Sequence, residues 1–473
     1  MTTSLQSARS DRLPAKLNRR RFLAGTAAVL ILPAASRAQS SSVVLEARRA
    51  SVQLAPEGYP TTKIWGYDGQ APGPELRLAQ GARLRRRLVN ALEQPTTIHW
   101  HGIRIDNAMD GVPGLTQDAV APGGTFDYDL TVPDAGTYWY HAHNQSPEQV
   151  GHGLYGALIV EEPEALDIDA EHVLILDDWR LTEDAQIAPD FAAMHDLSHG
   201  GRLGNFVTTN AAFAWRQSVR QNQRLRLRLI NAANARIFPL ALQGLDGWVA
   251  AYDGMPLPTP EKVSQGILLA PGQRVDLIVD VTAAEGEEAF LVHMDEDGGF
   301  AQAAFPVMGR ASLARRGKPA PLPPNQGQTL GDLAPARSVD MRIEGGAMGG
   351  LRSAMLNGED AGFREMARAG QFWAMAGSAG MPDAPLVMAS RGETIRVRMA
   401  NDTVFAHAMH LHGMHFREVM PGGAMGPMRD TLLLPARETR EIAFLADNPG
   451  EWLFHCHMLS HAASGMMQRV SVT

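Results

Sequence analysis

Apolar and polar residues alternate one by one along many short stretches of this 473-residue chain, and these stretches end at Gly-, Pro- or Asn-containing turns. Such alternation is typical of β-strands, because successive side chains of a strand point to opposite faces. Long stretches with the helical period are scarce, whereas the 46 glycines and 30 prolines supply many turns. The pattern therefore predicts an all-β protein built from many short strands.

One alternating strand recurs three times. It reads Leu-Arg-Arg-Arg-Leu-Val-Asn at 84–90, Leu-Arg-Leu-Arg-Leu-Ile-Asn at 225–231 and Ile-Arg-Val-Arg-Met-Ala-Asn at 395–401. A Pro-containing turn follows each copy at a similar distance and leads into another alternating strand. Three copies of one strand-rich unit predict three β-sandwich domains in series. Because the arginines alternate with apolar residues, we expect them to form solvated strand faces.

The composition of the connecting segments suggests where each unit ends. Glu-Glu-Pro near residue 162 marks the first boundary, and a Pro-rich stretch precedes the third copy. The predicted parts are an export signal at 1–40, domain 1 at 41–163, domain 2 at 164–317, a linker at 318–337 and domain 3 at 338–473.

The first forty residues differ from the rest of the chain. Consecutive arginines at 19, 20 and 21 precede an apolar run at 22–35, which Pro33 interrupts and which small residues follow. This run is too short to span a bilayer comfortably, and the pattern is typical of a twin-arginine export signal. No later segment approaches transmembrane length. We therefore expect the twin-arginine machinery to export a monomer, without a membrane span in its mature form, to a bacterial periplasm.

Charge and cysteine content narrow the chemistry. The net charge of −8 gives no electrostatic reason to expect a nucleic-acid partner. The one cysteine, Cys456, cannot form an intramolecular disulfide, and it stands between His455 and His457 with His461 and Met466 downstream. A thiolate, imidazoles and a weak thioether are the ligands of a blue-copper electron-transfer site. This stretch therefore predicts a metal site.

Histidines also recur in pairs that are separated by one residue. The first and third copies each carry two such pairs, whereas the middle copy has leucines at the matching positions. Residues i and i+2 of a strand share a face, so each pair presents two imidazoles together. Eight imidazoles suit copper better than magnesium or calcium. We expect the pairs to converge between domains 1 and 3 on a cluster of about three metal ions. The eight histidines are His99, His101, His141, His143, His410, His412, His455 and His457.

Only the third copy has the additional ligands for the blue-copper site. Aligned by the repeat, His407 matches Thr96, Cys456 matches Ala142, His461 matches Pro147 and Met466 matches His152. Strand alternation turns the Cys456 side chain away from those of His455 and His457. One strand therefore offers a short covalent route for electrons between the two predicted sites.

These motifs resemble the copper motifs of the multicopper oxidases, particularly three-domain laccases and bacterial copper-resistance oxidases, from about residue 45 to the end. The resemblance implies cupredoxin-like Greek-key β-sandwiches and four copper ions. It implies an oxidase that takes single electrons from phenols, aromatic amines, Cu(I) or Fe(II) and reduces O₂ to water. It also implies a type 1 copper on His407, Cys456 and His461 with Met466 as weak axial ligand, a type 2 copper on His99 and His410, and a type 3 pair on His101, His141, His143, His412, His455 and His457.

Two positions concern proton delivery. Asp110 follows His99 by eleven residues, where family members commonly have an acid that assists protons to oxygen. An Asp before Gly111 is also common in turns, which is the alternative. Some bacterial members have Glu directly after the third histidine of the last motif, where this chain has Ala462. We therefore expect a different group to serve that step.

Alternatives to a laccase-like enzyme remain at this level. They are a cuprous or ferrous oxidase that acts in copper tolerance and a copper-binding protein without turnover. Methionines are dense between residues 341 and 428, which suits either Cu(I) binding or flexible core packing. His195 and His199 are four residues apart and could form a labile metal site on a helix. No motif identifies the electron donor.

Overall fold

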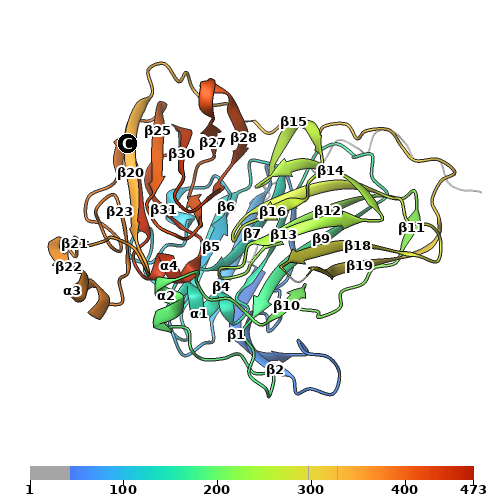
Figure 1. Ribbon diagram of the computed structural model, residues 1–473, viewed down its shortest axis with the longest axis horizontal. Coiled ribbons are helices and arrows are strands. Elements are labelled where there is room, and N and C mark those ends of the chain that lie inside the picture. The colour runs from blue at the N-terminus through green and yellow to red at the C-terminus, as the bar shows by residue number, and fades with distance from the viewer. Residues whose placement is uncertain (1–42, 297, 327–328) are drawn as a thin grey trace, which may run out of the picture. The chain divides into compact units, whose positions relative to one another are not determined.

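A computed structural model describes residues 43–296, 298–326 and 329–473 of the chain (Figure 1). The predicted export signal lies outside the described residues. Within the described part, β-strands dominate and the helices are short, which confirms the all-β prediction. None of the helices in these residues is both long enough and apolar enough to cross a membrane.

The three alternating strands have the same neighbours in each copy. Each one lies between a parallel strand that precedes it in the chain and an antiparallel strand that follows it. The three sets are β1 (Val43–Val52), β4 (Arg83–Asn90) and β6 (Thr125–Thr131); β9 (Ala170–Trp179), β12 (Arg224–Asn231) and β17 (Arg274–Val281); and β20 (Arg337–Gly345), β25 (Glu393–Asn401) and β30 (Thr439–Ala446).

Each set belongs to one of two sheets that pack together, and we refer to the three pairs as the first, middle and third sandwich. The first adds β2 (Thr62–Tyr67), β3 (Leu76–Ala79), β5 (Ile98–His101), β7 (Gly136–Ala142), β8 (Tyr155–Glu161), the 3₁₀ turn η2 (Asn107–Met109) and α1 (Ser146–Gly151). The middle adds α2 (Met194–Ser198), β10 (Phe206–Thr209), β11 (Val219–Gln221), β13 (Phe238–Gln243), β14 (Leu245–Tyr252), β15 (Met255–Lys262), β16 (Ile267–Leu269), β18 (Glu288–Asp295) and β19 (Gly298–Arg310).

The third sandwich has one small hairpin in addition to its two sheets. It adds β21 (Ser353–Leu356), β22 (Glu359–Gly362), α3 (Phe363–Arg368), β23 (Trp373–Met375), β24 (Val387–Ala389), β26 (His407–Leu411), β27 (Phe416–Val419), η3 (Pro421–Gly423), β28 (Met425–Arg429), β29 (Thr431–Leu434), β31 (Gly450–Cys456), α4 (Leu459–Ala463) and β32 (Met467–Val472). The sandwiches draw on residues 43–161, 170–310 and 337–472 in turn.

The asparagine that ends each alternating strand explains why the repeat includes it. Asn90, Asn231 and Asn401 are buried, and each side chain donates to a carbonyl of the returning segment at 2.8 Å. Each also accepts from the backbone N–H two residues on. A side chain that is both donor and acceptor at this point closes the turn and satisfies the buried backbone.

The arginine faces correct one expectation. In the middle sandwich the arginines are not solvated: Arg226 and Arg228 are buried and pair with Glu162, Glu171 and Asp276. In the first sandwich the expectation holds, because the Arg87 side chain is 48% exposed. Alternation shows which residues share a face, but whether that face meets water depends on the neighbouring sandwich.

Candidate metal centre

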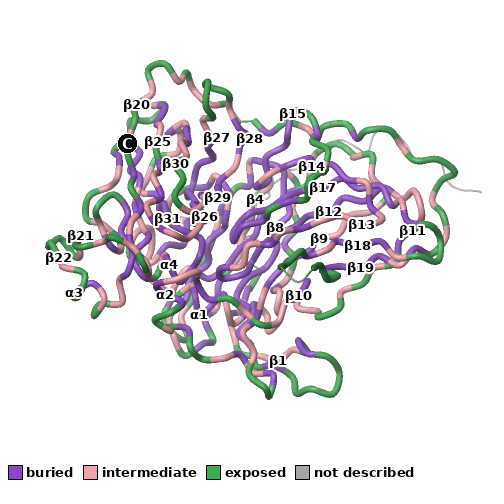
Figure 2. Tube along the Cα trace, viewed as in Figure 1, coloured by how far each residue is buried: buried purple, intermediate pink, exposed green. Residues whose placement is uncertain are grey.

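The four histidine pairs lie at the ends of two matching strand pairs. β5 runs antiparallel to β7 with His99 opposite His141, and β26 runs antiparallel to β31 with His410 opposite His455. All four strands are buried over most of their length (Figure 2). Adjacent strands therefore present two pairs of imidazoles from the first sandwich and two from the third.

The structure brings all eight histidines together. His99 stacks on His412 with ring centroids 3.9 Å apart, and His101 stacks on His410 at 3.8 Å. His143 lies 5.5 Å from His455 by the same measure. Each of these contacts joins the first sandwich to the third, so the cluster lies at their interface.

The hydrogen bonds of the cluster leave one ring nitrogen of most imidazoles open. Five rings donate from Nδ1: His99 to Asp110 O, His141 to Ala142 O, His410 to Asp430 O, His412 to Asp110 Oδ2 and His455 to Cys456 O. His101 donates from Nε2 to Asp430 Oδ1. All six distances lie between 2.9 and 3.2 Å. Four opposite ring nitrogens are buried without a partner in the described chain: His99 Nε2, His101 Nδ1, His141 Nε2 and His410 Nε2. A buried nitrogen without a partner is costly unless it binds something. Metal-binding histidines are commonly held in this way, with the second nitrogen bonded to an acceptor.

Burial lowers the pKa of seven of these eight imidazoles and so favours their uncharged form. It is the largest cause for each of the seven, and neighbouring histidines lower the values further. Neutral imidazoles expose lone pairs and suit a transition metal. The pKa values are lowered for His101, His141, His143, His407, His410, His412, His455, His457 and His461.

A second centre lies around the thiol of Cys456. Its Sγ is 3.8 Å from both His407 Nδ1 and His461 Nδ1, and these two nitrogens are 3.1 Å apart. His407 donates from Nε2 to Thr403 Oγ1 at 2.8 Å, and His461 donates from Nε2 to His199 O at 2.7 Å. Both Nδ1 lone pairs therefore face the thiol and each other, an arrangement that a cation between them would stabilise.

The environment of the thiol supports the same interpretation. Burial raises the pKa of Cys456 to about 12, although N–H groups of Met458 and Ala408 lower it. A thiolate at this depth therefore needs a positive ion as partner. Met466 is fully buried in the same apolar cluster as Cys456, and its carbonyl accepts from the Cys456 N–H at 3.2 Å.

Asp110 lies inside the histidine cluster, at the end of the turn that begins with η2. Its side-chain oxygens are 3.2 Å from His99 Nδ1 and 2.9 Å from His412 Nδ1. Asp110 thus contacts one histidine from each outer sandwich and is 1% exposed. The interpretation of Asp110 as a simple turn residue does not account for these contacts.

Sequence reasoning missed a second acid at the cluster. Asp430 precedes β29, the strand that pairs with β26, and its Oδ1 is 3.2 Å from His101 Nε2 and 3.3 Å from His410 Nδ1. Arg274 of the middle sandwich donates to both Asp430 oxygens, at 2.8 and 2.6 Å. Burial alone would raise the pKa of Asp430, but Arg274 and His101 outweigh burial and hold it well below its usual range. No motif marks this residue, and only its place beside a histidine-bearing strand could have indicated it.

The middle sandwich closes one side of the cluster although it supplies none of the predicted ligands. Gly272 has a φ of +81°, and a Cβ there would lie 2.8 Å from the His457 ring. A Cβ at Gly102, which follows the first histidine pair, would overlap the guanidinium of Arg274. Both positions therefore require glycine so that the backbone can approach closely.

A cavity of about 360 Å³ reaches the other side of the cluster. His143, His455 and Ala462 are among the residues that line it. Ala462 therefore faces space next to the histidines, where a glutamate side chain would place its carboxyl group.

The remaining histidines are not part of the eight-histidine cluster, although His415 Nε2 lies 3.7 Å from Asp430 Oδ2. His152 stacks on Trp65 at 4.2 Å and acts in packing. His195 and His199 stack on each other with ring centroids 4.1 Å apart, and the backbone carbonyl of His199 accepts from His461 Nε2.

Buried imidazoles from two β-sandwiches, next to a thiol with two further imidazoles, define a cupredoxin-like metal oxidoreductase. Comparison with known families agrees, because residues 49–165, 171–313 and 361–473 each match a multicopper oxidase domain. The chain belongs to the multicopper oxidase family, which confirms the resemblance and implies copper as cofactor, O₂ as acceptor and a reducing substrate.

Individual relatives cover nearly the whole chain. A multicopper oxidase from Pseudomonas thermotolerans has a TM-score of 0.79 and 33% identity over 91% of this chain and 98% of its own. Lac15 from a marine microbial metagenome has a TM-score of 0.74 and 41% identity over 91% and 100%. The copper resistance protein A homolog of Pseudomonas syringae pv. tomato is 26% identical over 86% of this chain and 88% of its own. The protein is therefore an oxidoreductase with laccase-like or metal-oxidising activity.

Proposed function

We propose that the protein is an exported laccase-like oxidase that uses four copper ions and reduces O₂ to water. His407, Cys456 and His461 would hold a type 1 copper with Met466 as weak axial ligand. His99 and His410 would hold a type 2 copper. His101, His141, His143, His412, His455 and His457 would hold a type 3 pair. Phenols or aromatic amines would donate the electrons.

One observation carries this proposal: a single strand end serves both centres. Cys456 contacts His407 and His461, whereas its neighbours His455 and His457 point into the eight-histidine cluster. When bound, copper would supply one-electron transfer at the thiol centre and oxygen reduction at the cluster. The peptide between the two would be the shortest route for electrons.

The chain's own groups would handle protons and access. Asp110, whose side-chain oxygens contact His99 and His412, would relay protons toward the cluster. The cavity at His143 and His455 gives a small molecule access to the histidines. Because Ala462 cannot carry a proton, a carboxylate route from that side is absent.

The location and the domain ranges remain proposals. We propose that residues 1–40 direct the chain through the twin-arginine machinery into the periplasm, where it works as a monomer. The ranges 41–163, 164–317 and 338–473, with a linker at 318–337, agree with the sheet pairs described above.

The test combines colour with oxygen uptake. Copper-loaded protein should show intense thiolate-to-copper absorption, and Cys456→Ser should abolish both this absorption and O₂ consumption. Loaded native protein without colour, or a serine variant that consumes O₂, would contradict the assignment. The same preparation, assayed with a phenol, Cu(I) and Fe(II), identifies the donor.

A second candidate is a cuprous or ferrous oxidase that acts in copper tolerance. The surface beside the thiol centre favours it, because Met194 and Met348 are exposed next to the stacked His195 and His199. A hydrogen bond connects the chain next to Met348 to α2: the Ala347 N–H donates to Ser198 O at 2.6 Å. Thioethers and imidazoles on this surface suit Cu(I). The relative from Pseudomonas syringae carries copper resistance in its name.

This candidate has its own test. Replacing Met194 and Met348 together by leucine should lower the rate with Cu(I) but not with a phenol. Met388→Leu, at an exposed methionine on β24, is the matched control. Equal rates with Cu(I) in all three proteins would rule out this docking surface.

A further inference from the structure

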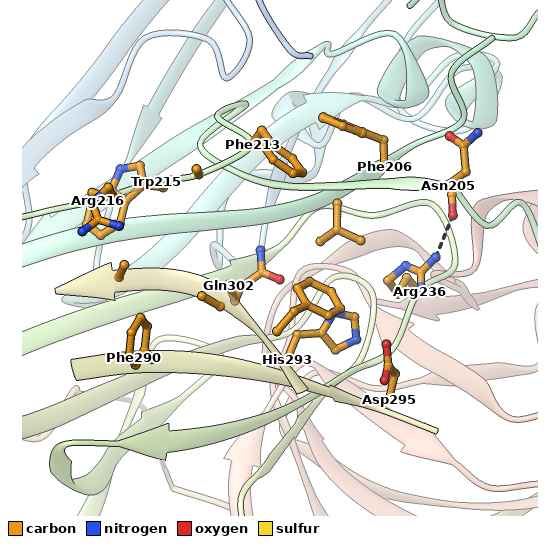
Figure 3. A pocket seen from close by; sticks show the side chains of 16 residues that line it. Asn205, Phe206, Phe213, Trp215, Arg216, Arg236, Phe290, His293, Asp295 and Gln302 are labelled. Atoms are coloured by element: carbon orange, nitrogen blue, oxygen red, sulfur yellow. Dashed lines mark hydrogen bonds between the residues drawn. The ribbon is translucent and has the colours of Figure 1, made fainter. Parts of the chain in front are cut away.

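The middle sandwich has a cavity of about 600 Å³ that none of the predicted metal ligands lines (Figure 3). Its walls come from β10, β18, β19 and the segment at 213–216. This volume is in the range of small-molecule pockets. The sequence gives no motif for it, and the proposed oxidase function does not use it.

Aromatic side chains form much of the wall. Phe206 and Phe213 stack with ring centroids 5.0 Å apart and 22° between their planes, and Phe300 lies 4.6 Å from the His293 ring. Phe213 is 54% exposed and Phe300 is 41% exposed. Large apolar rings that are this exposed at a cavity offer flat faces for another ring.

Two residues that line the cavity each have a buried polar atom without a partner in the described chain: Gln302 Oε1 and His293 Nδ1. Gln302 is 4% exposed, and its Nε2 donates to Thr208 O at 3.1 Å and to Thr209 Oγ1 at 2.8 Å. These bonds fix the orientation of the amide, so Oε1 is an acceptor that lacks a donor. Such groups are rare in the interior and need a partner.

The charges around the cavity, which Asp295 also lines, disfavour an anionic ligand. The guanidinium of Arg236 donates to Asp178 Oδ2 at 2.8 Å and to Gly204 O at 2.7 Å, and Arg216 is paired with Glu288. Burial, helped by Arg236, lowers the pKa of His293 to about 4, so this ring is neutral. A ligand carboxylate would therefore have no free guanidinium group to pair with. Its oxygen and Gln302 Oε1 are both hydrogen-bond acceptors, so they would repel each other.

We propose that this cavity binds a planar, uncharged aromatic compound with a hydroxyl group, which donates to Gln302 Oε1 while the ring lies among Phe206, Phe213 and Phe300. This site is separate from both metal centres. The proposal does not depend on the proposed oxidase function, because binding here requires no copper ligand.

The test is ligand-detected NMR titration of the full-length protein, as purified and kept under nitrogen to prevent turnover. The two probes are 4-methoxyphenol and methoxybenzene, which differ by one hydroxyl group. A buried hydrogen bond of about 1 kcal/mol predicts that the phenol binds about fivefold more tightly. Equal affinity for the two compounds, or no saturable binding of the phenol, would overturn the proposal.

Two variants of Gln302 separate the hydrogen bond from the structural role of this residue. Gln302→Met and Gln302→Glu both lose the bonds to Thr208 and Thr209, but only the glutamate keeps an acceptor. We expect Gln302→Met to lose the preference for the phenol and Gln302→Glu to retain it. Loss of the preference in both variants would contradict the assigned contact.

The aromatic wall has its own variant and control. Phe213→Ala should weaken both compounds severalfold, whereas Phe363→Ala, at an exposed phenylalanine of α3, should change neither. Unchanged binding of both compounds by Phe213→Ala would place the ligand elsewhere and overturn the proposal.

Discussion

The first and third sandwiches carry their histidine pairs on matching strands, yet only the third has a thiol centre. At the position of Cys456 the first sandwich has Ala142, and at that of His407 it has Thr96. Thr96 Oγ1 donates to the buried Gln149 Oε1 at 2.7 Å. Neutral side chains thus fill the space that imidazoles and a thiol occupy in the third sandwich. The fold supplies the position, and a few side chains decide whether it binds a metal.

The two acids at the cluster extend this comparison. Asp110 belongs to the first sandwich and Asp430 to the third. Each contacts one histidine of the first sandwich and one histidine of the third. Arg274 holds the pKa of Asp430 well below its usual range, although burial opposes this. In the described residues no arginine or lysine forms an ion pair with Asp110. The comparison indicates that Arg274 keeps Asp430 ionised, in a position where it contacts His101 and His410.

The largest expected effect comes from Asp110→Asn. We expect O₂ turnover to fall by about 10²–10⁴-fold, because an amide cannot donate and recover a proton as a general acid does. The copper content should stay native, since the amide oxygen can still accept from His412 and the backbone carbonyl of residue 110 from His99. Oxygen uptake and metal analysis test this, with Asp118→Asn at an exposed position as control. Native turnover in the Asp110 variant would show that this acid has only a structural role.

The repeat also predicts unequal stability effects at matched arginines. Arg228→Met removes one arginine from a buried ion-pair network in which Arg77 still pairs with Glu171 and Arg226 with Asp276. Breaking a buried pair costs about 3–5 kcal/mol of unfolding free energy, and the remaining partners should keep the loss at or below that range. Arg87→Met at the equivalent position of the first sandwich breaks only the exposed pair with Asp127 and should cost about 0–1 kcal/mol. Urea unfolding midpoints compare the two variants. Equal shifts in the two variants would mean that burial of the arginine does not determine how much its ion pairs contribute to the unfolding free energy.

Much of the architecture follows from the sequence because it is local. Alternation and the repeated Asn turns predict the strands, and i, i+2 spacing predicts which imidazoles share a face. The repeat even indicates which sandwiches carry the histidine pairs, since the middle copy has Leu240 and Leu242 where the others have histidine.

What the sequence could not show depends on packing between distant segments. The burial of Arg226 and Arg228 arises from the neighbouring sandwich and cannot be read from alternation. Asp430 is separated from Arg274 by 156 residues, so neither has a local signal that connects it to the histidines. The cavity at Gln302 forms where β10 and β19 meet, and its unpaired oxygen is visible only in three dimensions.

Asp430→Asn tests the third sandwich's acid. We expect the copper affinity of the cluster to fall by about 10–100-fold, as is usual when a carboxylate that orients metal-binding histidines is lost. Competition with a chelator measures this loss. Asp253→Asn is the comparison variant, because Asp253 pairs with Arg274 and accepts from the Asp430 N–H at 3.2 Å but makes no ion pair with these histidines in the described chain. An equal loss of affinity in both variants would attribute the effect to the support of Asp430 by its neighbours and not to its contacts with His101 and His410.

The smallest expected effect is at Met466, which matches His152 in the first sandwich. Met466→Leu keeps the buried volume and removes the thioether. Blue absorption should persist because Cys456, His407 and His461 remain, the reduction potential should change, and turnover should change by less than about tenfold. Potentiometry and absorption measure this, and His152→Leu, which removes the ring contacts with Trp65 and Phe191, should change neither. Loss of colour in Met466→Leu would show that the thioether is a required ligand. The thiol and the two imidazoles alone would then not explain why the third sandwich has a blue-copper centre and the first does not.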